Sequence, residues 1–308
     1  MLHDQSLTQA EQAFLNAPFA PGGWQVAVDA LAAATRSRHA QLVGIGGPLT
    51  IPFHILSDWP DDPNGHMNNV SLVGHGNWRI GTSDKAMAIR HEAHYAAYKA
   101  DHFSADYEDA MSDLDFQFGC HTALTLETSG STRLALLRTR REGACDSDTL
   151  ERFALLARQA ERAFRVQLAL GEQAAELMLA GVEGRGEATM LLDRTGQICG
   201  MSAAAEALLD EQQGLHEEGF AVRLSDNNEN QAFGAAMGRL LHGDGVNGPV
   251  LHEMVVGRSS DNPGGRWRLI IARLPEIEPG LNFAPTLAVT LRSKGHQNQM
   301  VMPVVAAA

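Results

Sequence analysis

"DSDTLERFALLARQAERAFRVQLALGEQAAELMLAG", residues 146–181, is the stretch that decides how this chain is organised. It contains no proline, and its apolar residues recur at alternating spacings of three and four, which is the heptad pattern of a long helix. Asp146 or Ser147 can cap the start of that helix, because either side chain accepts a hydrogen bond from a backbone N–H. The pattern therefore predicts one long helix over 146–181.

One seam of this helix is predicted to pair with a second copy of the chain. Its members are Phe153, Leu156, Ala160, Ala163, Gln167, Leu170, Ala174 and Leu177. Gln167 is the polar member, and a polar residue in a seam tends to fix the register of a coiled coil. Leu150, Phe164 and Leu168 lie off the seam, so a second apolar face can pack on the chain's own domain. The alternative is a single buried helix, but the stretch far exceeds the usual length of about 11–12 residues.

The residues before the long helix predict an α+β domain over 1–145. Helical spacing is found in Ser6–Ala17, from Trp24 onward and in Lys85–Ala100, while strand patterns cover His39–Ile45, Ile51–Leu56, Phe116–Glu127 and Thr132–Thr139. Residues 57–84 between them are dense in Asn, Asp, Gly and Pro. A loop of that length is usually a functional lid or a disordered segment.

The residues after the long helix predict a second domain over 182–294, followed by a tail at 295–308. Strand patterns cover Glu187–Leu192, Gln197–Gly200, Val250–Val256, Trp267–Leu274 and Thr286–Leu291, and helical patterns cover Ser202–Leu209 and Asn228–His242. Two strands, short helices and then three antiparallel strands is the order of elements in a PAS domain.

Three segments carry a resemblance to a known family. "EATMLLDRTGQICGMSAAAEALL" (187–209) resembles the opening of PAS domains, and residues 146–170 resemble the helix that leads into them. "GCHTALTLETSGSTRLALLRTRREG" (119–143) looks like the last two strands of a GAF-like domain. Together they resemble the sensory half of LuxR-type helix-turn-helix transcriptional regulators.

This resemblance implies two α+β sensor domains, each an antiparallel sheet with flanking helices. The first is GAF-like (1–145), the second PAS-like (182–294), and the long helix (146–181) joins them and dimerises. The chain departs from the family's pattern because it stops after the tail (295–308), where the family's DNA-binding domain would begin. We expect either a sensor fragment or a natural protein that lacks this output domain. The implied protein is a cytoplasmic homodimer that senses a small molecule.

Charge and composition exclude several classes of partner. The formal net charge of −13 argues against binding of phosphate backbones by this chain alone, although DNA binding is expected if a helix-turn-helix follows. The same charge disfavours anionic membrane surfaces. Three cysteines scattered through the sequence fit a reducing cytoplasm better than a disulfide framework.

A search for catalytic chemistry yields one weak cluster. His91 and His94 share a helical face, and His121 could supply a third nitrogen to a metal. A zinc protease needs the i, i+4 spacing of HExxH, which this cluster lacks. No cofactor motif is present, so we expect no cofactor, no metal and no enzyme activity. A metal-dependent enzyme at these histidines remains the least favoured alternative.

Aromatic residues point to a ligand site in the first domain. Small-molecule pockets are mostly apolar and aromatic, with a few oriented polar groups. The candidate ligand-binding residues are Trp59, Trp78, His91, His94, Tyr95 and Tyr98. We expect an aromatic or similarly planar metabolite there, closed over by the loop at 57–84. The alternatives are aromatic residues that only build a core, and a ligand-independent interaction protein that pairs with a full-length regulator.

Overall fold

The protein was analysed as a computed structural model, which describes residues 4–46, 53–59, 77–127, 130–183, 187–210, 214–219, 221–242, 250–257, 267–275, 281 and 284–293. The tail at 295–308 and most of the proposed lid, residues 60–76, lie outside the described residues. The chain divides into two compact units, the first made of residues 1–170 with 277–283 and the second of residues 171–276 with 284–308.

The first unit is built on a four-stranded antiparallel sheet. Its strands are β1 (His39–Gly46), β2 (His54–Leu56), β3 (Phe118–Glu127) and β4 (Gly130–Arg138), in the order β2-β1-β4-β3. Register is well defined between β1 and β4, where eight consecutive residue pairs oppose one another. Because side chains alternate along a strand, each strand presents residues to two faces of this sheet.

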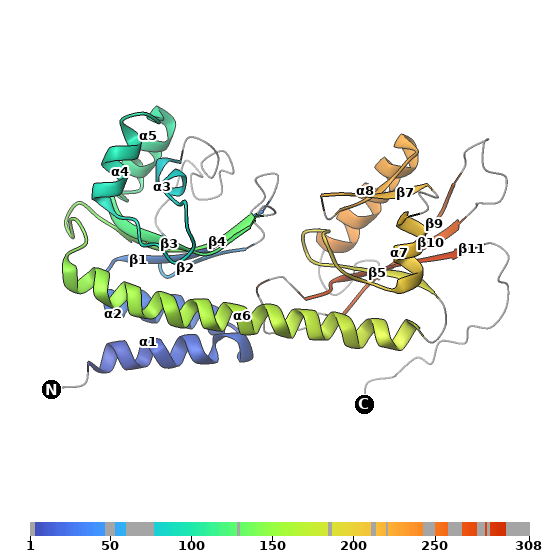
Figure 1. Cartoon of the computed structure of the whole chain (residues 1–308), viewed down its shortest axis with the longest axis horizontal. Coiled ribbons are helices and arrows are strands. Elements are labelled where there is room, and N and C mark those ends of the chain that lie inside the picture. The colour runs from blue at the N-terminus through green and yellow to red at the C-terminus, as the bar shows by residue number, and fades with distance from the viewer. Residues whose placement is uncertain are drawn as a thin grey trace. The chain divides into compact units, whose positions relative to one another are not determined.

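The inner face of this sheet is covered by two helices, and a third helix packs on one of them. The two covering helices are α2 (Gly23–Thr35) and the N-terminal part of α6 (Ser147–Glu183); α1 (Gln5–Asn16), which packs on α2, is drawn beneath them in Figure 1. The core between them is apolar and fully enclosed; among its members are Phe14, Trp24, Leu31, Leu42, Leu134, Leu136, Phe153 and Leu156. Burial of this surface holds the sheet and α6 together, at about 25 cal/mol per Å² of apolar area.

The outer face is covered by three short helices inserted between β2 and β3. They are α3 (Trp78–Gly81), α4 (Glu92–Lys99) and α5 (Ala105–Asp113), drawn above the sheet in Figure 1. A second, smaller core lies here; it contains Leu56, Trp78, Tyr95, Tyr107, Ala110, Met111, Leu114, Phe116, Ala135 and Leu137. This face is therefore more aromatic than the inner one.

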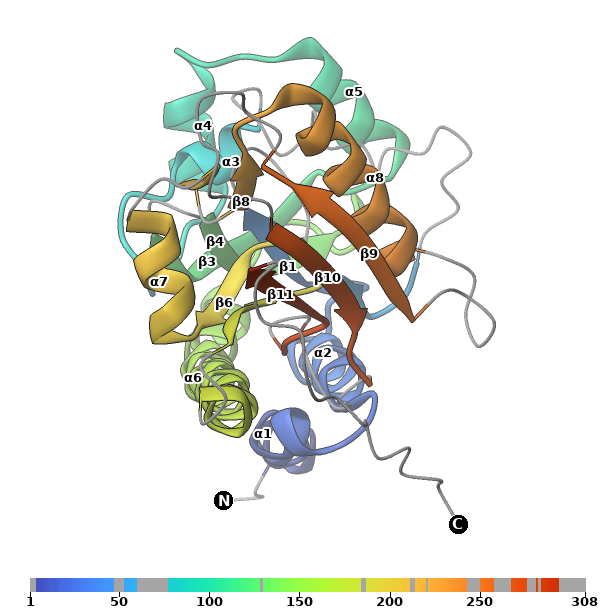
Figure 2. The same ribbon diagram turned by 90° about the vertical axis from the view of Figure 1, so that its right-hand side faces the viewer.

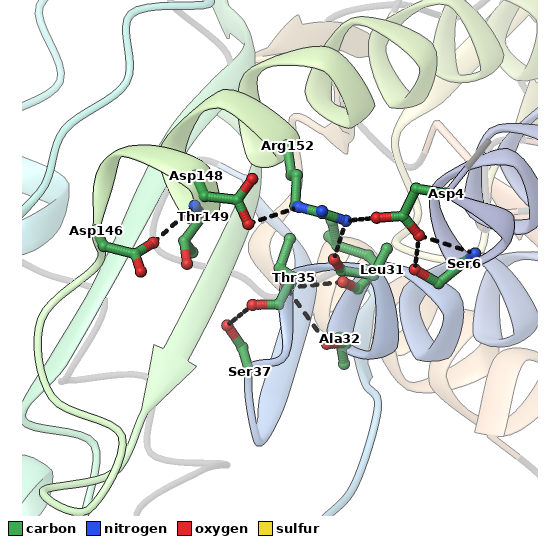
Figure 3. A network of polar contacts seen from close by, with 11 residues as sticks. Asp4, Ser6, Leu31, Ala32, Thr35, Ser37, Asp146, Asp148, Thr149 and Arg152 are labelled. Atoms are coloured by element: carbon green, nitrogen blue, oxygen red, sulfur yellow. Dashed lines mark hydrogen bonds and ion pairs between the residues drawn. The ribbon is translucent and has the colours of Figure 1, made fainter. Parts of the chain in front are cut away.

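Polar contacts fix the start of α6. Asp146 caps the helix, as predicted, by accepting a hydrogen bond from the backbone N–H of Thr149 at 2.8 Å. One turn later Arg152 forms an ion pair with Asp4, which itself caps α1. Arg152 also donates to the carbonyl of Ala34 at the end of α2, at 3.3 Å. These contacts join α1, α2 and α6 at one end (Figure 3).

The predicted dimerisation seam has a different role over most of its length. Phe153, Leu156 and Ala160 are 0% exposed in the first unit's own core. Gln167 is 4% exposed and accepts a hydrogen bond from the indole of Trp24 at 3.0 Å. The expectation that these four contact a second copy is corrected here, because helices of the same chain already cover them.

Two of the remaining seam residues face solvent. Leu170 is 36% and Leu177 69% exposed, and they share a side of α6 with Leu155 and Val166, both 39% exposed. At 100° per residue the four fall within about 60° of the helix circumference. We call Leu155, Val166, Leu170 and Leu177 the exposed stripe.

The second unit contains a five-stranded antiparallel sheet in the order β6-β5-β11-β10-β9 (Figure 2). The strands are β5 (Ala188–Leu192), β6 (Ile198–Met201), β9 (Leu251–Val256), β10 (Trp267–Arg273) and β11 (Leu287–Ser293). All five match strands predicted from the sequence. The predicted fold class, α+β with antiparallel sheets flanked by helices, is thus confirmed.

Helices and a hairpin complete the second unit. Helix α7 (Ala203–Asp210) begins after Ser202, whose hydroxyl accepts from Ala205 N–H at 3.3 Å. Helix α8 is Asn227–His242, and strands β7 (Leu215–Glu218) and β8 (Ala221–Leu224) form a hairpin that was not predicted. No helix among the described residues is long and apolar enough to cross a bilayer.

Candidate ligand-binding site

The two faces of the first sheet differ in chemistry. On β4, Leu134 and Leu136 belong to the inner core, so the alternation of a strand places Arg133 on the outer face. On β3, Cys120 belongs to the inner core and its neighbour His121 points outward. Buried polar groups that can contact a ligand therefore lie on the outer face.

Three aromatic rings pack together above this outer face. The Trp78 ring centroid lies 5.4 Å from that of Tyr95 and 5.2 Å from that of Tyr107. All three side chains are buried. Trp78 is held at the start of α3 because Asn77 caps that helix, accepting from the N–H of Ile80 at 3.0 Å.

His121 lies at the centre of a chain of hydrogen bonds. Its Nδ1 is 2.8 Å from the Tyr95 hydroxyl, which donates to the Arg90 carbonyl at 2.9 Å. Its Nε2 is 2.8 Å from the Ser83 hydroxyl, and Ser83 accepts from Arg133 Nη1 at 2.6 Å. A neutral His121 protonated on Nδ1 satisfies every contact in this chain.

The electrostatic surroundings keep His121 neutral. Burial lowers the pKa of His121 to about 3, and the positive charges of Arg133, Arg79 and Arg90 act in the same direction. Burial also raises the pKa of Tyr95 well above its usual range, so its hydroxyl stays protonated. The buried network therefore carries positive charge on its arginines alone.

Three buried N–H donors at this site have no hydrogen-bond partner among the described residues. They are Trp78 Nε1, Arg79 Nε and Arg90 Nε. The Arg79 guanidinium lies over two rings, 5.2 Å from the centroid of Trp78 and 5.6 Å from that of Tyr95. Buried donors are nearly always paired in folded proteins, so these three are available to an additional acceptor.

The structure brings together only part of the predicted ligand set. Trp78 and Tyr95 form the cluster, and Tyr98 is partly buried at its edge. Trp59 is 49% exposed and packs on His54 instead, with ring centroids 5.0 Å apart. Sequence reasoning missed the other members of the site, which are the buried Arg79, Tyr107 and Arg133 and the partly buried Ser83.

The predicted histidines have local roles. His91 and His94 form a reciprocal cap at the start of α4, with ring centroids 4.6 Å apart. Both ring nitrogens of His121 already make hydrogen bonds. Within the part of the chain that the structure describes, no group of three or more His, Cys, Asp or Glu side chains is arranged to hold a metal.

A groove lies elsewhere on the first unit, beside α6. It has a volume of about 570 Å³ and is lined by Met87, Ile89, Ala154, Ala157, Arg158, Glu161, Arg162 and Arg165. Half of these residues are apolar, and three of the other four are arginines.

Comparisons with known proteins place few limits on function. No protein-family model matches the sequence, and no curated protein matches it. Among solved structures, the VqsR LBD domain from Pseudomonas aeruginosa is 9% identical, with a TM-score of 0.39 over 52% of this chain and 95% of that one. The LuxR-family transcription factor CepR2 from Burkholderia cenocepacia, described as N-acylhomoserine lactone dependent, is 13% identical, with a TM-score of 0.37 over 52% and 92%.

A longer similarity extends over both units. The bacteriophytochrome RpBphP3 from R. palustris is 11% identical, with a TM-score of 0.43 over 95% of this chain and 65% of that one. All three scores lie below 0.5, so these likenesses carry no argument about what the chain binds.

Proposed function

We propose that this chain is the ligand-sensing and dimerising part of a bacterial transcriptional regulator that acts in the cytoplasm. Its first unit binds a small, planar organic molecule on the outer face of the sheet. The observation that carries this proposal is the buried indole N–H of Trp78, which lacks a partner among the residues the structure describes. An unsatisfied buried donor costs about 1–3 kcal/mol, and a bound acceptor removes that cost.

The chemistry around Trp78 supports small-molecule binding. Ligand pockets combine apolar and aromatic walls with a few placed polar groups. Trp78, Tyr95 and Tyr107 supply the aromatic surface, while His121 and Arg133 supply the polar groups. The proposal involves binding without a catalytic step.

A route from the site to α6 passes through the sheet. On β4, Arg133 reaches the outer network while the adjacent Leu134 contributes to the core that contains Phe153 and Leu156 of α6. A small shift of β4 on ligand binding would therefore change the packing under α6. Such coupling requires that the ligand bind one arrangement of the helix more tightly than the other.

The exposed stripe supports the dimerising part of the proposal. Four large apolar side chains on one side of α6 face solvent, and a second copy of α6 would cover them. We propose this stripe as the homodimer contact. In the ligand-independent alternative, the same stripe pairs with the helix of a full-length regulator and no metabolite is bound.

A thermal-shift screen of metabolites separates the ligand-sensing function from the ligand-independent alternative. A ligand that binds only the folded state at 100 times its Kd stabilises it by about 2.7 kcal/mol. We expect planar aromatic metabolites to raise the Tm of the wild type. Trp78→Phe keeps an aromatic ring but removes the indole N–H, so it should lose most of that shift.

Trp59→Phe is the matched control, because Trp59 lies outside the aromatic cluster. It should keep the full ligand-induced shift. Equal Tm shifts in both variants would show that the ligand does not bind at Trp78. A screen that finds no stabilising compound would favour the ligand-independent function.

A further inference from the structure

We infer that the ligand of the outer face is an organic anion, an aromatic carboxylate whose acid group lies against Arg133 and Arg79. This inference rests on the proposed function and names the chemical class of its ligand. It follows from two buried guanidinium groups that have no carboxylate partner among the described residues.

Arg133 is 6% exposed, and its hydrogen bonds go to neutral groups. Its Nε donates to the Ser131 hydroxyl at 3.1 Å and its Nη1 to the Ser83 hydroxyl at 2.6 Å. Burial lowers the pKa of this guanidinium to about 10, so it still carries its charge at neutral pH. No ion pair to Arg133 occurs within the ranges that the structure describes.

Arg79 is also 6% exposed, and its positive charge is compensated only by a carbonyl dipole and by aromatic rings. Its Nη2 donates to the Phe116 carbonyl, and its guanidinium lies against the faces of Trp78 and Tyr95. Its Nε has no partner in the described part of the chain. Cation–π contacts contribute about 0.5–2 kcal/mol, less than the cost of burying a charge.

The carboxylates that act on this network are already engaged. Glu92 accepts the backbone N–H of Gly119 at 2.8 Å, and Asp84 forms an ion pair with Arg90. Neither forms an ion pair with Arg79 or Arg133 in the described part of the chain. Arg133 reaches His121 through Ser83, and Arg79 lies over Tyr95, the other hydrogen-bond partner of His121.

A bound carboxylate supplies the missing countercharge. A charge buried without a partner costs several kcal/mol, and a guanidinium matches the two oxygens of a carboxylate. The chain as a whole carries a formal charge of −13, so preference for an anion has to come from these two buried arginines. The aromatic part of such a ligand would lie against Trp78 and Tyr95.

Matched acids and amides test the inference by titration calorimetry. The probes are benzoate, phenylacetate and indole-3-acetate, each compared with its neutral primary amide. We expect at least one acid to bind at least ~10-fold more tightly than its amide, a ratio that corresponds to about 1.4 kcal/mol. Equal or weaker binding of the acids would overturn the anion inference, while binding of amides alone would leave the proposed function standing.

Two variants of Arg133 show whether that residue supplies the preference. Arg133→Gln removes the charge and should abolish the preference for acid over amide. Arg133→Lys keeps a positive charge and should retain the preference with weaker binding. An absence of any binding, in this panel and in the metabolite screen, would overturn both the inference and the proposed function.

The ligand-free protein gives an independent readout. If the Arg133 charge is buried without a partner, Arg133→Gln should leave the Tm of the empty protein unchanged or raised. A merely structural Arg133 gives the opposite pattern: a lowered Tm with the acid preference intact. That pattern would contradict the assignment to this residue.

Discussion

Two buried polar side chains, His121 and Gln167, lie on opposite sides of the first sheet. His121 belongs to the outer network with Tyr95 and Ser83, and Gln167 belongs to the inner core, where it pairs with Trp24. Each is a polar residue in a place where an apolar one would pack more simply. Substituting His121 therefore tests the candidate site, and substituting Gln167 tests the inner core.

Replacing His121 should change how stability depends on pH. The folded-state pKa is about 3 and the unfolded value about 6.5, so below pH 6.5 the unfolded chain binds a proton that the folded chain does not. The stabilisation is present above that value and is lost as the pH falls. Between pH 7.5 and 5.5 the wild type should lose about 1.4 kcal/mol more than His121→Gln.

Urea denaturation followed by tryptophan fluorescence measures this difference, because three of the four tryptophans lie in the first unit. Burial also lowers the pKa of His54, to about 4, so some pH dependence of the same sign should remain in the variant. Equal losses in wild type and variant would show that His121 does not stay neutral.

Replacing Gln167 with Leu should destabilise the first unit by about 1–3 kcal/mol. The indole N–H of Trp24 loses its acceptor inside an apolar core. Gln173→Leu is the matched control, because Gln173 is exposed on the same helix. If both substitutions shift the denaturation midpoint equally, the buried hydrogen bond contributes nothing specific.

The site was only partly predictable from single residues. Trp78 and Tyr95 were identified because aromatic residues are concentrated in the first domain. Arg79 and Arg133 were missed, since a lone arginine near or within an apolar segment does not reveal what packs around it. The available signal was the alternation along β4, where Arg133 precedes the inward-facing Leu134.

At the scale of elements, periodicity located α6 but not its partner. The predicted bounds, 146–181, differ by two residues or fewer from the observed Ser147–Glu183. A heptad seam shows which side chains need cover, and α1 and α2 of the same chain supply that cover for its first half. The β7–β8 hairpin was missed because its strands are short and polar, as in Leu215–Glu218.

Charged substitutions on α6 should therefore separate folding from dimerisation. Leu156→Asp places a carboxylate in a fully buried core and should unfold the first unit. Leu170→Asp lies on the exposed stripe and should leave the fold intact while it shifts the mass from dimer to monomer. Circular dichroism and light scattering measure the two effects. If the Leu156→Asp variant were folded and monomeric, the predicted seam that contains Leu156 would be the dimer contact after all.

At the scale of the whole molecule, charge predicts how the chain behaves toward nucleic acid. The basic residues Arg158, Arg162 and Arg165 line one groove, but Arg165 is paired with Glu161, and the formal net charge is −13. We expect no retardation of duplex DNA by the 308-residue chain at physiological salt. Retardation that weakens as salt is raised would contradict this.

The measurement that tests the central claim most directly is hydrogen–deuterium exchange of the whole chain with and without a ligand identified by the screen. Binding on the outer face predicts slower exchange in residues 77–113 and in strands β3 and β4, because α3, α4 and the His121 network are held by the bound molecule. Exchange in β9, β10 and β11 of the second unit should be unchanged. Protection confined to the second unit, or to α6 along the basic groove, would contradict the account.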